Sequence, residues 1–215
     1  KENLIIDVRS PAEFKQGHIP HAVNMPLFDN EERALVGTLY KQEGKQIAIE
    51  KGLEIVGPKM LSFVKFVQSH TSKRTVYVHC WRGGMRSSSV AWLLRMVGYE
   101  VLLLEGGYKS YRNFVLKKFE EKCRFLVLGG RTGSGKTALL NLLAEAGEQI
   151  IDLEQIAHHK GSAFGSIGES KQTSSEQFEN NLCEQMLALD LKRNIWLEDE
   201  SRFIGSCIIP LSFWE

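Results

Sequence analysis

The stretch TVYVHCWRGGMRSSS (75–89) decides the fold of the first half of the chain. Its first five residues are mostly β-branched or aromatic, as in a buried strand, and a helical run from Ser88 to Val97 follows the glycines. A strand, a glycine-rich loop and a helix N-terminus form the arrangement in which backbone amides bind phosphate-like anions. A cysteine at the mouth of such a loop indicates covalent sulfur or selenium chemistry beside a bound anion.

Cys80 has two features that lower the pKa of a thiol, because it precedes a helix N-terminus and has Arg82 and Arg86 close in sequence. A structural cysteine at a strand end is the alternative. The full C-x5-R-S pattern favours Cys80 as the nucleophile, with both arginines as its catalytic partners. Two glycines in the loop allow the positive φ angles that an anion site needs. The residues of the predicted anion loop are Gly83, Gly84 and Ser87.

A second anion loop follows about forty residues later. The apolar run FLVL (125–128) leads into GRTGSGKT (130–137), a complete Walker A motif placed after a strand and before a helix. In this motif backbone amides bind phosphate oxygens, the lysine adds positive charge and the threonine holds Mg²⁺. The residues predicted to contact phosphate are Gly130, Gly133, Gly135, Lys136 and Thr137.

An acidic partner for Mg²⁺ has two candidates. Asp152 ends one predicted strand, and Asp199 lies in the acidic run EDE (198–200) that ends another. The acidic run makes Asp199 the better candidate, and a solvated strand end is the alternative. The four cysteines form no CxxC pair and have no metal-ligand spacing, so we expect no other metal site.

Composition excludes several functional classes. The 215 residues suffice for one or two domains, and 27 Lys and Arg against 26 Asp and Glu give a net charge of +1, which indicates no strong global field. No apolar run approaches the ~20 residues of a membrane helix, and no secretory h-region is present, although the chain starts at a lysine. Four cysteines without a CxxC pair predict free thiols in a reducing cytoplasm.

Strands that alternate with helices predict an α/β fold with mostly parallel sheets. We place a domain boundary near residue 121, which gives a first domain over 1–121 and a P-loop domain over 122–215 that we expect to be truncated at its C-terminus. The predicted strands are 4–8, 22–24, 75–79, 101–104, 125–128, 149–152 and 194–200. The predicted helices begin at Pro11 and cover 31–40, 57–69, 88–97, 108–122, a segment ending at 146, and 178–191, with a loop at 161–175.

A basic segment lies between the two loops, with Tyr108 and Tyr111 interleaved among its cations. Such a mixture suits RNA, because cations contact phosphates and aromatic rings stack on bases. An exposed amphipathic helix is the alternative. Trp81 is a further candidate for base stacking, or else a packed wall of the cysteine loop. The candidate tRNA contacts are therefore Trp81, Lys109, Arg112, Lys117 and Lys118.

The first domain resembles the rhodanese fold in DVRS (7–10), EF (13–14), GHIPHA (17–22), NMP (24–26) and EGGY (105–108). One departure matters. Sulfur-transferring rhodaneses have one residue fewer between cysteine and arginine, and the longer spacing here resembles the Cdc25-type phosphatases of the same superfamily. A wider loop has more room for a tetrahedral oxyanion, which suits a phosphate-bearing donor.

The order of these parts resembles the bacterial tRNA 2-selenouridine synthase family, with further matches at DLE (152–154), GSAFG (161–165), FEN (178–180) and EDESR (198–202). This resemblance implies a cytoplasmic selenotransferase that replaces the sulfur of wobble 2-thiouridine in tRNA with selenium from selenophosphate. It also implies geranyl transfer from geranyl diphosphate as an activating step, contact with selenophosphate synthetase, and no tightly bound cofactor. Family members extend past residue 215, so we expect a helical C-terminal portion to be absent.

Under this resemblance Cys80 carries selenium as a perselenide, and Arg82 and Arg86 hold the donor phosphate. The Walker loop binds a diphosphate, that of the prenyl donor or of a nucleotide. The rival function is a Cdc25-like rhodanese phosphatase fused to a nucleotide kinase or NTPase, which explains both loops without RNA. A non-catalytic rhodanese module that regulates an NTPase is a third option, against which the intact C-x5-R loop argues.

Overall fold

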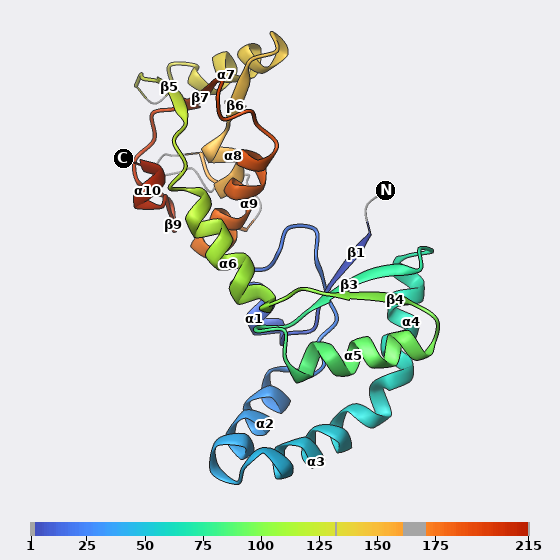
Figure 1. The fold of residues 1–215 in the computed structure, drawn as a ribbon. Coiled ribbons are helices and arrows are strands. Elements are labelled where there is room, and N and C mark those ends of the chain that lie inside the picture. Colours follow the sequence, from blue (N-terminus) through green and yellow to red (C-terminus); the bar gives the residue numbers. More distant parts are fainter. Residues whose placement is uncertain (1–2, 132, 161–170, 215) are drawn as a thin grey trace. The chain divides into compact units, whose positions relative to one another are not determined.

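The computed structural model describes residues 3–131, 133–160 and 171–214 (Figure 1). The chain divides into two compact units, unit 1 over Lys1–Arg112 and unit 2 over Asn113–Glu215. Each unit contains its own parallel sheet, which confirms the predicted α/β class. The domain boundary near residue 121 stays a prediction.

Unit 1 is built on a four-stranded parallel sheet in the order β2-β1-β3-β4. Every strand predicted for this part of the chain is present. Because parallel strands place their carboxyl ends at one edge, the residues that follow β3 lie where α/β folds bind ligands. The strands are β1 Leu4–Asp7, β2 Val23–Asn24, β3 Thr75–His79 and β4 Glu100–Leu103.

The helices of unit 1 begin where the sequence offers capping residues. Ser10 and Glu13 form a capping box at the start of α1, and Asp29 and Glu32 form a second one at the start of α2. Helix α3 was not predicted, since it has no side-chain cap and buries only small residues. The helices are α1 Pro11–Gln16, α2 Asn30–Gln42, α3 Lys45–Val56, the 3-10 turn η1 Gly57–Lys59, α4 Met60–His70 and α5 Met85–Met96. Helix α6 Gly107–Lys118 begins in unit 1 and ends in unit 2.

The core of unit 1 holds the cysteine loop in place. Figure 1 shows α4 and α5 on one side of the sheet, and their apolar faces bury residues of the central strands. Cys80 itself belongs to this core cluster, so the loop starts from a fixed point. Fully buried members of the cluster include Ile6, Val67, Val78 and Leu94.

Unit 2 contains a three-stranded parallel sheet in the order β5-β7-β6. Its three strands were predicted, whereas the short helices α8 and α10 and the antiparallel β8–β9 pair were not. The strands are β5 Arg124–Leu128, β6 Gln149–Ile151, β7 Asn194–Glu198, β8 Phe203–Ile204 and β9 Cys207–Ile208. The helices are α7 Lys136–Glu145, α8 Leu153–Ala157, α9 Ser175–Leu187 and α10 Leu211–Trp214.

Two sequence predictions fall partly or wholly outside the described residues. Most of the predicted loop at 161–175 does so, and its described end, 171–174, has no regular structure before α9. The GSAFG match (161–165) also lies outside them.

None of the helices that the structure describes is long and apolar enough to cross a bilayer.

Candidate active site at two glycine-rich loops

Cys80 lies at the carboxyl end of β3, where the loop 80–84 leads into helix α5. Its side chain is 3% exposed, and Sγ lies 3.2 Å from Oγ of Ser87, which is itself buried. Ser87 Oγ also donates to the carbonyl of Gly84 at 3.0 Å. The hydroxyl can accept from the thiol or donate to the thiolate, so the sulfur has a fixed hydrogen-bond partner in both forms.

The loop lowers the pKa of the Cys80 thiol. Burial raises this pKa, but hydrogen bonds from the Ser87 hydroxyl and from the backbone of Ser87, Arg82 and Gly84 outweigh burial. Hydrogen bonding in the loop is therefore the main cause of the lowered pKa, and the predicted contribution of the arginine charges is not among the causes. By contrast, burial raises the pKa of Cys123 and of Cys207. Of these three cysteines, Cys80 is the one whose surroundings favour a reactive thiolate.

The turn before α6 closes over this loop. Gly107 has φ 61°, and a Cβ there would meet the Gly83 amide nitrogen at 2.6 Å and the Cys80 carbonyl oxygen closer still. Only glycine permits both the left-handed backbone and this approach. Tyr108 N donates to the Cys80 carbonyl and Lys109 N to the Trp81 carbonyl, each at 2.9 Å. The EGGY segment thus fixes the base of the cysteine loop.

A buried polar stack supports the same region. Arg9 is 1% exposed, and its guanidinium pairs with Asp7 at 2.6 Å and lies 3.7 Å from the centre of the Tyr108 ring. Tyr108 is fully buried, so its ring is not available to stack on an RNA base, and that part of the RNA interpretation is wrong. Arg9 of the DVRS motif and Tyr108 of the EGGY motif, which are far apart in sequence, are therefore in contact in the structure.

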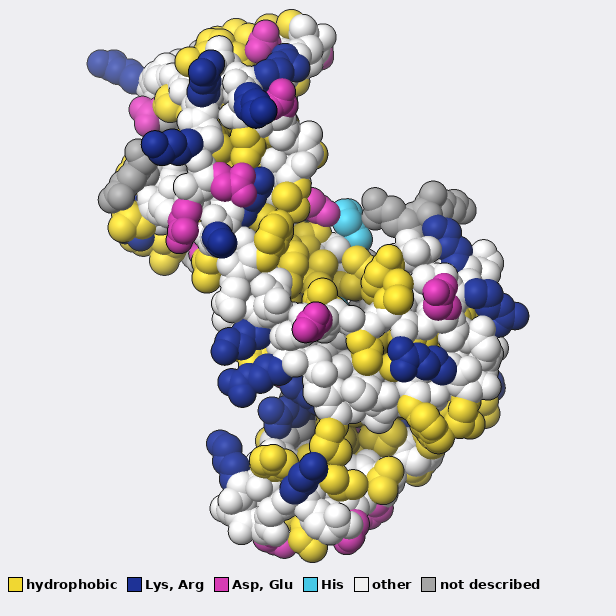
Figure 2. All heavy atoms as spheres, viewed as in Figure 1, with side chains coloured by type: hydrophobic (Ala, Val, Ile, Leu, Met, Phe, Trp, Pro, Cys, Tyr) yellow, Lys and Arg dark blue, Asp and Glu magenta, His cyan; other side chains and the backbone are white. Residues whose placement is uncertain are grey.

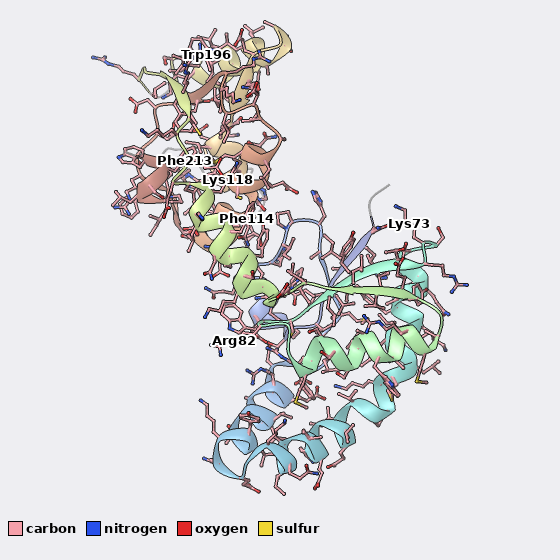
Figure 3. The ribbon with its side chains drawn as sticks, in the orientation of Figure 1. Lys73, Arg82, Phe114, Lys118, Trp196 and Phe213 are labelled. Atoms are coloured by element: carbon pink, nitrogen blue, oxygen red, sulfur yellow. The ribbon has the colours of Figure 1, made fainter. Side chains whose placement is uncertain are left out.

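The two loop arginines differ in their surroundings. Arg86 is half-buried and pairs with Glu13, with Nη1 at 2.7 Å from Oε2 and Nη2 at 3.2 Å from Oε1. Arg82 is exposed, on the part of unit 1 where several Lys and Arg side chains gather (Figures 2 and 3). Trp81 is 37% exposed and tilts against Tyr108, so it is both a packed wall and accessible. In the sequence, Glu13 is visible only as part of the EF motif, and its pairing with Arg86 was not predicted.

The Walker loop of unit 2 has the backbone that its glycines predict. Gly133 and Gly135 have φ 80° and 84°, and α7 begins at Lys136. Lys136 Nζ donates to the Gly130 carbonyl at 3.1 Å and lies 3.9 Å from Oε1 of Glu200. Thr137 follows in the first turn of the helix. The loop and its lysine therefore lie beside the acidic run at the end of β7.

Three glutamates, rather than the predicted aspartates, gather at this loop. Carboxylate oxygens of Glu154, Glu198 and Glu200 lie within 4.8 Å of one another. Glu198 is 3% exposed, and its Oε1 has no hydrogen-bond partner. Burial, followed by the neighbouring carboxylates, raises the pKa of Glu154 to about 7, and burial also raises the pKa of Glu200. The cluster has the oxygen ligands that a divalent cation requires.

Neither predicted aspartate belongs to this cluster. Asp152 caps α8 and accepts from Gln155 N at 2.8 Å. Asp199 is exposed, and its backbone nitrogen donates to the Leu128 carbonyl at 3.0 Å. Their role as Mg²⁺ ligands stays a prediction. Glu154 lies in the DLE segment, so this sequence match was the available signal for it.

The basic segment forms α6 and the residues after it. Lys109 and Lys117 are exposed, whereas Arg112 and Lys118 are half-buried and Lys118 Nζ pairs with Glu121 at 2.7 Å. Figure 3 labels Lys118 near Phe114, and both line a shallow surface cavity of about 420 Å³. The accessible cations of this helix are thus Lys109 and Lys117.

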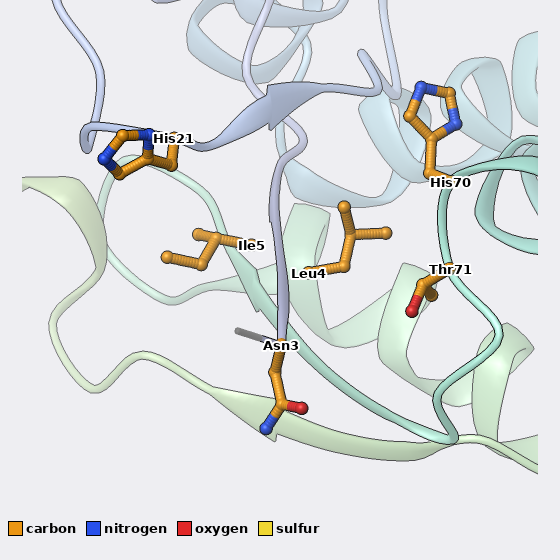
Figure 4. A pocket seen from close by; sticks show the side chains of 6 residues that line it. All are labelled: Asn3, Leu4, Ile5, His21, His70 and Thr71. Atoms are coloured by element: carbon orange, nitrogen blue, oxygen red, sulfur yellow. The ribbon is translucent and has the colours of Figure 1, made fainter. Parts of the chain in front are cut away.

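Another shallow cavity, of about 210 Å³, lies at the opposite end of the unit 1 sheet from Cys80 (Figure 4). Leu4 and Ile5 line it at the start of β1, while Cys80 follows the end of the parallel strand β3. This cavity is therefore separate from the cysteine loop.

Comparison with known proteins matches both units. The rhodanese-like domain family matches residues 1–114, and the family described as tRNA 2-selenouridine synthase AAA domain matches residues 123–215. The tRNA 2-selenouridine synthases of Nitrosomonas europaea and Proteus mirabilis are 40% and 42% identical to the chain over 98% of its length. These alignments cover 56% and 58% of the two relatives, so the chain spans little more than half of their length.

A solved structure is also similar to about half of the chain. It is the N-terminal domain of a Clostridium difficile 630 protein described as ATP/GTP binding, with 45% identity and a TM-score of 0.50. The comparison covers 53% of this chain and 88% of that domain. The chain therefore belongs to the rhodanese-like family through its first 114 residues, and it is similar to tRNA 2-selenouridine synthases over 98% of its length.

Proposed function

We propose that the protein is a tRNA 2-selenouridine synthase, which replaces the sulfur of wobble 2-thiouridine with selenium. One observation carries the proposal: the thiol of lowered pKa in a C-x5-R-S loop, within a chain similar over 98% of its length to proteins of that name. The thiolate is the nucleophilic form of cysteine, so this loop suits covalent handling of selenium.

At the cysteine loop, the donor is selenophosphate. Arg86 and the loop amides bind its phosphate oxygens, and the exposed Arg82 adds positive charge at the entrance. Cys80 is the nucleophile of this loop, and Ser87 stabilises its thiolate. The hydrogen bonds to Sγ and the pairing of Arg86 with Glu13 support these roles.

The Walker loop binds a diphosphate, for which we propose geranyl diphosphate as the donor of an activating prenyl group. Lys136 and the amides of the loop hold the phosphate oxygens. Mg²⁺ fits this site, because the buried Glu198 has a carboxylate oxygen without a partner next to two more carboxylates. The ion would be held by Glu154, Glu198 and Glu200 together with Thr137, and it would neutralise charge on the diphosphate.

The proposed macromolecular substrate is tRNA containing 2-thiouridine, and the proposed location is therefore the cytoplasm. Trp81 offers an accessible ring for base stacking near the cysteine, and Lys109 and Lys117 offer charges for backbone phosphates. Selenophosphate synthetase is a proposed partner, because it makes the donor that the cysteine loop accepts.

A second candidate function is a Cdc25-like phosphatase joined to a nucleotide kinase or NTPase. The five residues between Cys80 and Arg86 favour it, since this spacing is the one typical of such phosphatases. The similarity of the second unit to a tRNA 2-selenouridine synthase domain favours the first proposal instead.

Mass spectrometry of wobble nucleosides tests the proposal directly. Cells that carry the gene should contain 2-selenouridine, and cells that lack it or carry Cys80→Ser should contain none, while Cys123→Ser should behave as the unchanged protein. Normal 2-selenouridine in the Cys80→Ser strain would show that Cys80 is not the nucleophile. Release of phosphate from an aryl phosphate, lost in Cys80→Ser and without any effect on 2-selenouridine, would support the phosphatase.

A further inference from the structure

We infer that Glu13 is a positioning residue for Arg86, an inference that rests on the proposed role of the cysteine loop as an oxyanion site. Glu13 lies on α1, distant in sequence from the loop, and the comparisons assign it no role. Its carboxylate nevertheless engages both terminal nitrogens of the Arg86 guanidinium, at 2.7 and 3.2 Å. It thereby sets the orientation of the arginine at the mouth of the loop.

Glu13 is itself held from a second direction. Oε2 accepts from the backbone nitrogen of Ser10 at 3.0 Å, as part of the capping box of α1. The side chains of Arg86 and Glu13 are only 17% and 27% exposed, so solvent screens this pair less than a surface ion pair. Because α1 starts from the buried end of β1, the carboxylate is anchored to the rigid part of unit 1.

The pairing leaves Arg86 able to bind an anion. A guanidinium has five N–H donors in a planar fork, and a carboxylate across the two terminal nitrogens uses one hydrogen of each. The Nε hydrogen and the remaining terminal hydrogens stay free for the oxygens of a tetrahedral anion. Glu13 therefore directs one side of the fork towards helix α1 and leaves the other side for the ligand.

Glu13 keeps its charge at neutral pH. Burial raises the pKa of Glu13, but the hydrogen bond and charge of Arg86, the Ser10 amide and the Arg33 charge outweigh burial and lower it. A purely electrostatic role would have the opposite consequence for a ligand, because a carboxylate close to the loop repels an anion. The two roles therefore predict changes of opposite sign when Glu13 is neutralised.

The experiment measures how well inorganic phosphate protects Cys80 from alkylation by iodoacetamide, in the full-length protein. The apparent Kd for phosphate should rise roughly fivefold in Glu13→Gln and in Glu13→Asp, which lies within the range of coupling between residues in direct contact. Glu13→Asp keeps the charge but shortens the side chain by one methylene. Circular dichroism melting of each variant monitors the fold.

A matched control exists within the same unit. Glu32 occupies the same capping-box position on α2 and also pairs with a cation, Lys59, but it belongs to a different helix. Glu32→Gln should lose a comparable cap and ion pair and leave the Kd for phosphate unchanged. If Glu32→Gln lost as much affinity for phosphate as Glu13→Gln, the cause would be general destabilisation, and the positioning role would be contradicted.

Other outcomes separate this inference from the proposed function. If phosphate protects Cys80 in the unchanged protein and equally well in both Glu13 variants, the positioning role is wrong and the oxyanion site stands. Tighter phosphate binding in Glu13→Gln would show that Glu13 competes with the anion. If phosphate fails to protect the unchanged protein, the oxyanion site is wrong and the inference falls with it.

Discussion

The two glycine-rich loops differ in how completely the described part of the chain satisfies their charges. At the cysteine loop the thiol has a hydroxyl and backbone partners, and Arg86 is paired with a carboxylate. At the Walker loop Lys136 lies 3.9 Å from Glu200, one of three glutamates whose carboxylate oxygens are within 4.8 Å of one another, and one buried carboxylate oxygen has no partner. At the first loop, Cys80 and Arg86 therefore have partners among the protein atoms, whereas the second loop has three carboxylates close to one lysine.

This difference indicates different requirements for the same kind of ligand. A loop with a paired arginine and inward amides accepts an oxyanion directly. A loop flanked by clustered carboxylates repels a diphosphate unless a cation neutralises them, and Mg²⁺ bound by carboxylates and phosphates is the usual arrangement. We therefore expect ligand binding to depend on a divalent cation at the Walker loop and not at the cysteine loop.

The largest effect expected from this comparison is that of Lys136→Ala. Loss of a charged hydrogen-bond donor should weaken binding of inorganic diphosphate in the presence of Mg²⁺ roughly tenfold to a hundredfold. Isothermal titration calorimetry measures this affinity, and Lys192→Ala, at an exposed position outside the loop, is the control. In cells, prenylation of the thiouridine should fall more than selenium incorporation. An unchanged affinity for diphosphate would show that the Walker loop is not the diphosphate site.

A second prediction concerns pH and the glutamate cluster. The pKa of Glu154 is raised from 4.5 to about 7, so the folded state binds this proton more tightly than the unfolded state does. Stability without Mg²⁺ should therefore fall as pH rises from about 4.5 to about 7, and the loss should be complete above that window. Thermal melting across pH measures it.

Two variants define this pH dependence. The melting temperature of Glu154→Gln should vary less between pH 4.5 and about 7, because the carboxyl group with the raised pKa is absent. Mg²⁺ should raise the melting temperature of the unchanged protein at pH values above the window and have little effect on Glu198→Gln. The same response to Mg²⁺ in both proteins would show that the ion binds elsewhere.

The smallest effect is expected for the exposed cations of α6. Lys109→Glu and Lys117→Glu should each weaken tRNA binding and reduce the slope of log affinity against log salt by roughly 0.7 to 0.9 per lost phosphate contact. Binding is measured across a salt series, with Lys45→Glu on α3 as a control at another exposed lysine. If the tRNA affinity and the salt slope of these variants matched those of Lys45→Glu, α6 would be ordinary solvent-exposed surface and not a tRNA contact.

Much of this molecule could be predicted from local sequence. Both parallel sheets, the strand before each loop and the helix that begins at Pro11 follow from short patterns, and the structure has them. Helix α3 could not be predicted in the same way, because only Ala48 and Gly52 of its residues are buried and the usual apolar stripe is weak.

The partners of the loops were harder to predict, because they are distant in sequence. Glu13 meets Arg86 across 73 positions, and only folding brings them together. Likewise Glu154 joins Glu198 and Glu200 because α8 follows β6, which pairs with β7, whereas sequence position favoured Asp199. The spacing of a motif predicts which residues share a loop, but not which distant side chains satisfy its charges.

The central claim is that unit 1 presents an activated thiolate in a loop that is ready to bind an oxyanion. The most direct test is the pH dependence of alkylation at individual cysteines, read by peptide mass spectrometry. Cys80 should react with a half-maximal pH below that of Cys123, and Ser87→Ala should move the Cys80 value upwards towards it. A Cys80 that titrates at or above Cys123 in the unchanged protein would contradict the claim.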